Sequence, residues 1–228
     1  TLTIDPKGNL KIILGKGEVI QANSSINNLW RVVLRNTLNN RDYEITSGKN
    51  VTLGTEGETI RMKVTDFTVE NKTLPVKAEF TISVKDDAFC FSGALKSESD
   101  EWKFKDLDYP VISGIRINGS QTGIYWPVGL GQYFDNPVEF GTRSIRYPGG
   151  DGAAMAWFSV NSSNGGLYIG SHDALQETKV LNLAFDKSTR LYKAFINSTI
   201  QDKGFTIPDI MIKPYAGEWY TAAKFYRA

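Results

Sequence analysis

The sequence predicts an all-β fold: a large antiparallel sandwich of two sheets, followed by a short C-terminal helix. Most segments alternate apolar and polar residues with a period of two, as in 60–65 and 78–85, which is the pattern of a strand with one buried face. Turn-forming clusters separate a dozen or more such segments, a spacing typical of a sandwich or barrel. No long helical period occurs before the last dozen residues, so a parallel sheet covered by helices is not expected.

The expected strands follow one another along the whole chain. Most are half-buried strands that end at clusters rich in Gly, Asn or Asp. In the middle, a Pro-Gly-Gly turn at 147–152 precedes an apolar strand, a tight hairpin connection at 161–166 and a return strand. The segments expected to form strands are 10–14, 19–22, 30–34, 43–46, 60–65, 78–85, 89–95, 102–104, 111–117, 153–160, 167–170, 180–185, 191–196 and 210–212.

Residues 217–228 break the period of two. Trp219, Ala222, Ala223 and Tyr226 are spaced i, i+3, i+4 and i+7, which predicts an amphipathic helix with an aromatic stripe. An aromatic stripe needs a surface to cover it, and no Gly, Asn or Pro closes the helix. We therefore expect it to lead into another domain.

Two parts of the chain follow from this interpretation. Residues 1–214 are expected to form one β-sandwich domain, and 215–228 to begin a helical linker to a further domain. Trp219 and Tyr226 are the candidates for the interface between the two domains.

Charge and hydropathy exclude several classes of partner. The 26 basic and 25 acidic side chains leave a formal net charge of +1, and no run of Lys or Arg is long enough to attract phosphates. No segment approaches the roughly 20 apolar residues of a membrane span. Neither a nucleic acid nor a membrane is expected as a partner.

The chain has one cysteine and one histidine, Cys90 and His172. An intramolecular disulfide is therefore excluded, and a conventional zinc site cannot be assembled. No Asp-x-Asp-x-Asp-Gly loop is present for calcium. We expect no metal and no cofactor, and we expect Cys90 to be a small strand or core residue rather than a nucleophile.

Four segments, taken in their order, resemble the N-terminal β-sandwich of large bacterial glycoside hydrolases. In that family, which includes endo-α-N-acetylgalactosaminidase-like enzymes, a galactose-mutarotase-like supersandwich precedes a catalytic (β/α)8 barrel. The resemblance covers roughly the second half of the chain. The four segments are DYPVISGIRINGSQTGIYWPVGLGQYFDNP (108–137), RYPGG with AMAWFSV (146–160), GGLYIGSHD (165–173) and PYAGEWYTAAKFYRA (214–228).

The resemblance implies that 1–214 form a non-catalytic β-supersandwich domain, which supports a catalytic barrel and could line its glycan cleft, and that 215–228 begin the helical linker to that barrel. Glycoside hydrolysis uses two carboxyl groups about 5 to 9.5 Å apart, and no spacing among the 25 acidic residues singles out such a pair. No catalytic residue is assigned, so the fragment is expected to be inactive alone. The parent enzyme would process glycans outside the bacterial cytoplasm, in the periplasm, at the surface or as a secreted protein.

Two alternatives stay open. A stand-alone carbohydrate-binding module would need an exposed platform of aromatic rings. A sugar mutarotase or epimerase would need His172 to face a carboxylate across a concave sheet, whereas the mutarotases themselves use paired histidines.

Two groups of residues are candidates for contact with carbohydrate. Aromatic rings near Gly123, Gly129 and Gly131 could stack on pyranose faces, although in a β-sandwich they could equally be core or interface residues. At the end of a strand, an imidazole could donate to a sugar hydroxyl while the carboxylate orients it; alternatively the carboxylate accepts backbone N–H groups in a turn. The candidates are Trp126, Tyr125, Tyr133, Tyr147, His172 and Asp173.

Overall fold

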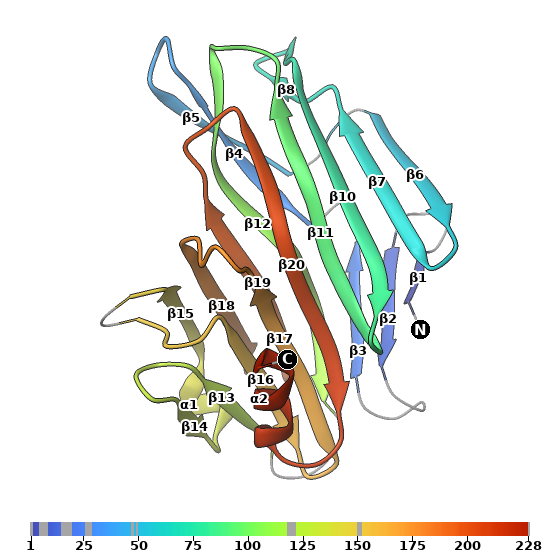
Figure 1. Cartoon of the computed structure of the whole chain (residues 1–228), viewed down its shortest axis with the longest axis vertical. Helices are drawn as coiled ribbons and strands as arrows, with labels where there is room; N and C mark the ends of the chain where they lie inside the picture. The colour runs from blue at the N-terminus through green and yellow to red at the C-terminus, as the bar shows by residue number, and fades with distance from the viewer. Residues whose placement is uncertain are drawn as a thin grey trace.

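The fold is a sandwich of two large antiparallel sheets (Figure 1). The computed structural model describes residues 2–4, 9–14, 20–25, 29–46, 48, 50–117, 122–149 and 152–227, with side chains described from residue 29 onward. Each sheet has nine strands, and every strand pair among the described residues is antiparallel. The predicted fold class, an all-β two-sheet sandwich with a short C-terminal helix, is confirmed.

Sheet 1 contains the first strands of the chain and the long central strand β12. Its order is β1 (Leu2–Ile4), β2 (Asn9–Leu14), β3 (Ile20–Ser25), β12 (Trp102–Ile117), β19 (Leu191–Thr199), β18 (Lys179–Asp186) and β15 (Thr142–Tyr147). Strand β12 also pairs with β4 (Arg31–Asn36), which pairs with β5 (Arg41–Ile45).

Sheet 2 covers sheet 1. Its order is β14 (Gln132–Phe134), β13 (Gly123–Trp126), β16 (Trp157–Ser162), β17 (Gly165–His172), β20 (Gly204–Tyr215), β11 (Ala88–Ser97), β10 (Val76–Lys85), β7 (Thr59–Thr65) and β6 (Asn50–Glu56). The remaining elements are the short pair β8 (Thr68–Val69) and β9 (Lys72–Thr73), and two helices, α1 (Pro137–Phe140) and α2 (Trp219–Arg227).

The period-two pattern correctly located most strands. All the predicted segments overlap observed strands; 102–104 and 111–117 belong to the single strand β12, and 153–160 becomes a strand only at Trp157. The sequence reasoning missed β1, β6, β8, β9, β13, β14 and β15, which are short or lie at or near sheet edges. In the turn predicted at 147–152, Gly150 and Asp151 lie outside the described residues, as does Val19 of the segment 19–22.

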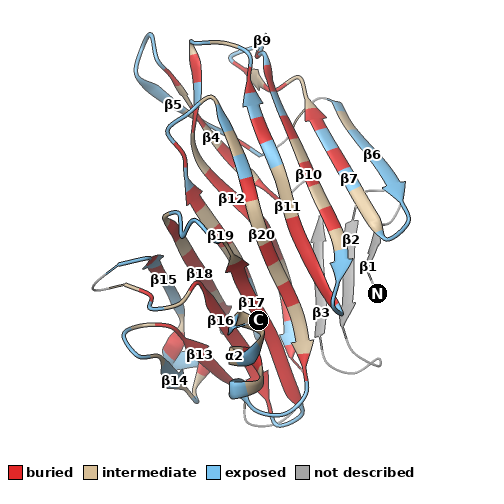
Figure 2. Cartoon of the chain, in the orientation of Figure 1, coloured by how far each residue is buried: buried red, intermediate tan, exposed pale blue. Residues whose placement is uncertain are grey.

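Alternation along each strand decides which side chains enter the core. In β10 the residues Val76, Ala78, Phe80 and Ile82 are buried, whereas those between them are partly or fully exposed (Figure 2). The same alternation in β4 and β19 fills the core from sheet 1. The sandwich interior is thus the surface on which the inner faces of the two sheets meet.

Aromatic rings join the two sheets at the centre of the core. Phe80 of sheet 2 lies between Trp30, stacked at 5.7 Å, and Tyr109 of β12, whose ring centroid is 4.6 Å away. The Tyr109 hydroxyl donates to the carbonyl oxygen of Thr81 at 3.1 Å. Sheet 1 therefore contacts sheet 2 here through apolar surface and one directed hydrogen bond.

Within the part of the chain that the structure describes, no helix has both the length and the apolar composition needed to cross a lipid bilayer.

Replacing Phe80 with alanine tests the aromatic contact between the sheets. The ring is only 1% exposed, so the change leaves a cavity, and we expect the free energy of unfolding to fall by about 3–5 kcal/mol. Chemical denaturation measures it. The control is Leu53→Ala on the edge strand β6, where the side chain is 46% exposed and a loss within about 0.5 kcal/mol is expected. Equal losses in both variants would contradict this packing.

Candidate functional site

A column of four aromatic rings crosses the outer face of sheet 2, the face turned away from sheet 1. Tyr125 of β13, Trp157 of β16 and Tyr168 of β17 follow one another across neighbouring strands, with ring centroids 4.6 and 5.6 Å apart. Trp219, the first residue of α2, continues the column on the other side of Tyr125 at 4.9 Å and an interplanar angle of 3°. We call these four residues the aromatic column.

Glycines on the same face make room for large rings. A Cβ atom at Gly170 would lie 2.2 Å from the hydroxyl oxygen of Tyr168, and one at Gly166 would lie 2.6 Å from that of Tyr215. Gly166 pairs directly with Tyr215 across β17 and β20. The Gly-Gly and Ile-Gly steps of β17 therefore let tyrosine rings lie flat against the sheet.

Helix α2 packs on this aromatic surface (Figure 1). Ala222 is fully buried, and Phe225 meets Tyr168 edge to face at 5.9 Å. The ammonium group of Lys213 on β20 lies 4.6 Å from the centroid of the Phe225 ring, a cation–π contact. Much of the predicted aromatic stripe of the helix is therefore covered by the sheet of its own chain.

The second interface candidate, Tyr226, lies near the C-terminal end of α2. Its hydroxyl accepts a hydrogen bond from the backbone N–H of Ala156 at 3.3 Å, and its ring centroid is 5.9 Å from that of His172. Burial, together with the nearby Tyr226 hydroxyl, raises the pKa of Tyr147 to about 12. Tyr147 is thus a buried, neutral group at pH 7 beside Tyr226.

His172 ends β17 beside this cluster. Its Nε2 atom shares a hydrogen bond with the hydroxyl of Tyr168 at 3.0 Å. Burial lowers the pKa of His172, with the negative charge of Asp209 opposing this effect and Lys85 adding to it. Because an exposed imidazole already has a pKa near 6.5, this ring is neutral at pH 7.

Asp209 is a carboxylate that the sequence reasoning did not single out. It lies directly opposite His172 in the pairing of β17 with β20. Its strand is recognisable in the sequence, but the pairing of two strands almost forty residues apart is not. The mutarotase alternative required His172 to face a carboxylate across a concave sheet, whereas Asp209 is its neighbour on the adjacent strand.

Asp173 organises the turn that joins sheet 2 to sheet 1. Its carboxylate accepts hydrogen bonds from the backbone N–H groups of Leu175 (2.9 Å) and Glu177 (2.7 Å), and from the ammonium of Lys179 (2.7 Å). The two charged side chains are only 6% and 1% exposed. Desolvation acts to raise the pKa of Asp173, but these hydrogen bonds outweigh it and the pKa is lowered. The structure shows the turn arrangement for this residue.

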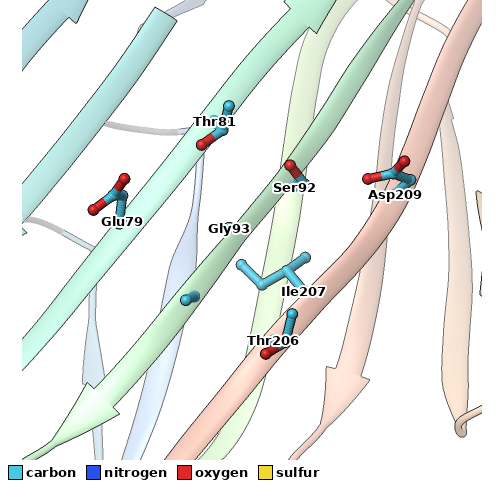
Figure 3. Close-up of a pocket in the computed structure, with 8 residues that line it drawn as sticks. Glu79, Thr81, Ser92, Gly93, Thr206, Ile207 and Asp209 are labelled. Carbon is cyan, nitrogen blue, oxygen red and sulfur yellow. The ribbon is translucent and has the colours of Figure 1, made fainter.

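A polar hollow of about 340 Å³ lies further along the outer face, between β10, β11 and β20. The register of β11 against β20 shifts between Phe91 and Gly93 at this hollow. Figure 3 shows oxygen atoms of Glu79, Thr81 and Asp209 around this hollow. The carboxylate of Glu79 forms ion pairs with the guanidinium of Arg61 (N–O distance 3.4 Å) and the ammonium of Lys63 (3.9 Å).

The hollow does not combine its carboxylates with the imidazole. His172 is absent from its lining, which consists of Glu79, Thr81, Ser92, Gly93, Ala94, Thr206, Ile207 and Asp209. A general acid–base pair needs both groups within reach of one substrate atom. The described lining therefore has hydroxyl and carboxylate groups that could bind a polar ligand, but it has no imidazole that could exchange a proton with that ligand.

A second cavity, of about 580 Å³, lies where β14, the β16–β17 hairpin and the start of α2 meet. We call it the junction cavity; it is lined by Tyr133, Asn161, Ser162, Ser163, Gly217, Glu218 and Trp219. Tyr133 is 49% exposed and Trp219 is 38% exposed. It therefore combines two accessible aromatic rings with polar side chains.

The candidate residues from the sequence thus occupy three environments. Trp126 faces the sandwich core, 2% exposed between Phe140 and Phe158. Tyr125 lies within the aromatic column, whereas Tyr133 lines the junction cavity. The remaining candidates, Tyr147, His172 and Asp173, gather at the other end of α2.

Cys90 is buried on β11. Burial, reinforced by the charge of Asp209, raises the pKa of its thiol to about 11, which disfavours the reactive thiolate. Among the described residues, no three His, Cys, Asp or Glu side chains are grouped in a way that could hold a metal ion.

Replacing Asp173 with asparagine tests the buried ion pair. The change leaves the Lys179 ammonium buried without a counter-charge, so we expect the free energy of unfolding to fall by about 3–5 kcal/mol at pH 7. Chemical denaturation measures the loss. The control is the double variant Asp173→Asn/Lys179→Met, which removes both charges and should recover much of it.

The pH dependence gives a second measure of the same pair. Because the folded-state pKa of Asp173 is lowered, its contribution to stability is present above the unfolded pKa of about 3.9 and is lost as pH falls through the lower folded value. The difference between the wild type and Asp173→Asn should therefore shrink below about pH 4. A difference that is constant from pH 7 to pH 3 would contradict the arrangement.

The sequence matches no protein-family model and no curated protein. Solved structures do match. The α-N-acetylgalactosaminidase NagBb from Bifidobacterium bifidum, in its complex with Gal-NHAc-DNJ, superimposes with a TM-score of 0.65 at 12% identity over 99% of this chain. The GH36 α-galactosidase AgaB from Geobacillus stearothermophilus superimposes with a TM-score of 0.54 at 7% identity over 98% of this chain. The galactosidase domain of the α-galactosidase–sucrose kinase AgaSK superimposes with a TM-score of 0.53 at 8% identity over 95% of this chain.

These matches show that the chain has the fold of one region of longer glycosidases. It covers 36% of the NagBb chain and 42% of each of the other two. The resemblance to a β-sandwich domain of glycoside hydrolases is confirmed at the level of the fold.

Proposed function

We propose that the chain is the N-terminal, non-catalytic β-supersandwich domain of a bacterial glycoside hydrolase, and that it supports a (β/α)8 catalytic barrel. The observation that carries this proposal is coverage: nearly the whole chain superimposes on little more than a third of NagBb. NagBb and the two α-galactosidases act on α-linked galactose-type sugars according to their names. The substrate class we propose for the parent enzyme is accordingly an α-galactoside or an α-N-acetylgalactosaminide.

The described outer face of sheet 2 favours a structural role for this domain over a catalytic one. Of the two carboxylates in the polar hollow, Glu79 forms ion pairs with Arg61 and Lys63, and His172, which the mutarotase alternative requires, does not line the hollow. Large apolar side chains are available for a neighbouring domain: Leu130 in the β13–β14 loop is fully exposed and Leu175 after β17 is 81% exposed. Such side chains are suited to contacts between domains.

In this proposal residues 1–214 form the sandwich and 215–228 connect it to the barrel. Trp219 and Tyr226 then fix the direction in which the connection leaves the sheet, and 143–173 supplies loops to one wall of the glycan cleft. The catalytic carboxylates belong to the barrel, where strand ends can place two of them on either side of a glycosidic bond. We place the parent enzyme outside the cytoplasm, where polymeric glycans are degraded.

Assay of the chain by itself tests its non-catalytic role. We expect it to release no 4-nitrophenol from the 4-nitrophenyl α-glycosides of galactose and N-acetylgalactosamine above the uncatalysed rate, because in this proposal the two catalytic carboxyl groups belong to the barrel. The full-length protein encoded by the same gene is the positive control and should hydrolyse one of the two.

Turnover by the 228-residue chain would contradict the proposal. If that turnover fell about 100-fold or more in Asp209→Asn or His172→Gln, the outer face of sheet 2 would be an active site. Polarimetry with galactose and glucose extends the assay to the mutarotase alternative, with acceleration of mutarotation as the outcome in its favour.

A further inference from the structure

We propose that the junction cavity is a binding site for a neutral pyranose. This inference goes beyond the support of a barrel and does not depend on it, because every group involved belongs to this chain. It rests on a fixed aromatic ring, on a polar wall opposite that ring, and on the charge of the cavity.

The fixed ring is Trp219. One of its faces is covered by the parallel ring of Tyr125 at 4.9 Å, and Tyr125 is itself held by Trp157 at 4.6 Å. The 38% of Trp219 that is exposed therefore belongs to the opposite face and the ring edge, on the side of the cavity. An aromatic ring that is already immobilised loses little conformational entropy when a ligand stacks on it.

Tyr133 supplies a second ring. It is half exposed on the edge strand β14, and its position is fixed by Gly123, where a Cβ atom would lie 2.1 Å from the tyrosine hydroxyl. Pyranoses present flat surfaces of C–H groups, and an aromatic face covers such a surface while the sugar hydroxyls remain at the rim. Two rings at one cavity suit a ligand of that shape.

Asn161 forms the polar wall. Its side-chain NH2 donates to the Tyr133 hydroxyl at 3.3 Å, while Oδ1 has no hydrogen-bond partner among the described residues although Asn161 is only 7% exposed. Reversing the amide would leave NH2 without a partner instead, so one end is unsatisfied in either orientation. Sugar hydroxyls both donate and accept. The Tyr133 hydroxyl, which accepts from Asn161, can also donate to a sugar hydroxyl, so a ligand would extend this network.

Size and charge select the class of ligand. A volume of about 580 Å³ lies within the usual range of small-molecule sites, about 300–1,000 Å³, and accommodates one or two sugar rings. Among the described residues that line the cavity, Glu218 alone is charged. A carboxylate at this position can accept hydrogen bonds from sugar hydroxyls, but it repels an acidic sugar or a sugar phosphate. The cavity is thus expected to discriminate in favour of neutral sugars.

Saturation-transfer NMR and calorimetry with the 228-residue chain test the proposal. The probes are methyl α-D-galactopyranoside, methyl α-D-glucopyranoside and glucuronate. We expect at least one neutral glycoside to bind with a Kd of about 1 mM and glucuronate to bind more weakly. Trp219→Ala should raise the Kd about tenfold or more, and Tyr133→Phe, which keeps the ring and removes the hydroxyl, should weaken binding by a smaller factor.

Tyr220→Ala is the matched control. Tyr220 follows Trp219 on the same helix and is 49% exposed, but it does not line the cavity, so the Kd should be unchanged. Because Trp219→Ala could release α2, Glu218→Gln provides a variant at an exposed position, and it should remove the discrimination against glucuronate while retaining neutral glycosides.

Three results would overturn the proposal. They are no binding of either neutral glycoside by the wild type, equal weakening by Trp219→Ala and Tyr220→Ala, and discrimination against glucuronate that survives in Glu218→Gln. None of these results bears on the hydrolysis assay, so failure here is distinguishable from failure of the barrel-support role.

Discussion

The structure depends on covering both faces of β16 and β17. Every described residue of β16 is buried, and so is every residue of β17 except His172. Sheet 1 covers their inner face, while α2 covers the outer face, where Trp157 and Tyr168 project away from the sandwich. Exposing rings of this size to water would be costly. A helix that follows β20 directly is therefore required by the side chains that β16 and β17 carry.

This arrangement divides the outer face of sheet 2 into two parts. Where α2 lies, the surface is aromatic and closed, and Asn161, whose Oδ1 has no hydrogen-bond partner among the described residues, lies at the rim beside Trp219. Beyond the helix, β10, β11 and the first half of β20 present carboxylates and hydroxyls in an open hollow. We therefore expect the proposed contacts of this domain, with a barrel or with a sugar, at the surface beside α2 and not at the surface that α2 covers.

The sequence predicted what depends on local periodicity and could not predict what depends on pairing. Alternation in 60–65 and 78–85 located β7 and β10, and the spacing of Trp219, Ala222 and Tyr226 located α2. The identity of the surface that covers α2 was not accessible, because it arises when β13, β16 and β17 come together. Trp126 and Tyr125 lie on opposite faces, in the core and in the aromatic column, as alternation along a strand requires, but the strand β13 itself was not predicted. The position of Asp209 opposite His172 depends on the pairing of β17 with β20.

Hydrogen–deuterium exchange of the 228-residue chain, read at the amides of α2, tests most directly whether the helix is an integral part of the sandwich. The account predicts that the amides of Ala223 and Phe225 exchange slowly, with protection approaching that of β16 and β17, because opening the helix would expose the aromatic column. Exchange at the rate of an unstructured peptide, while β16 and β17 stay protected, would contradict it.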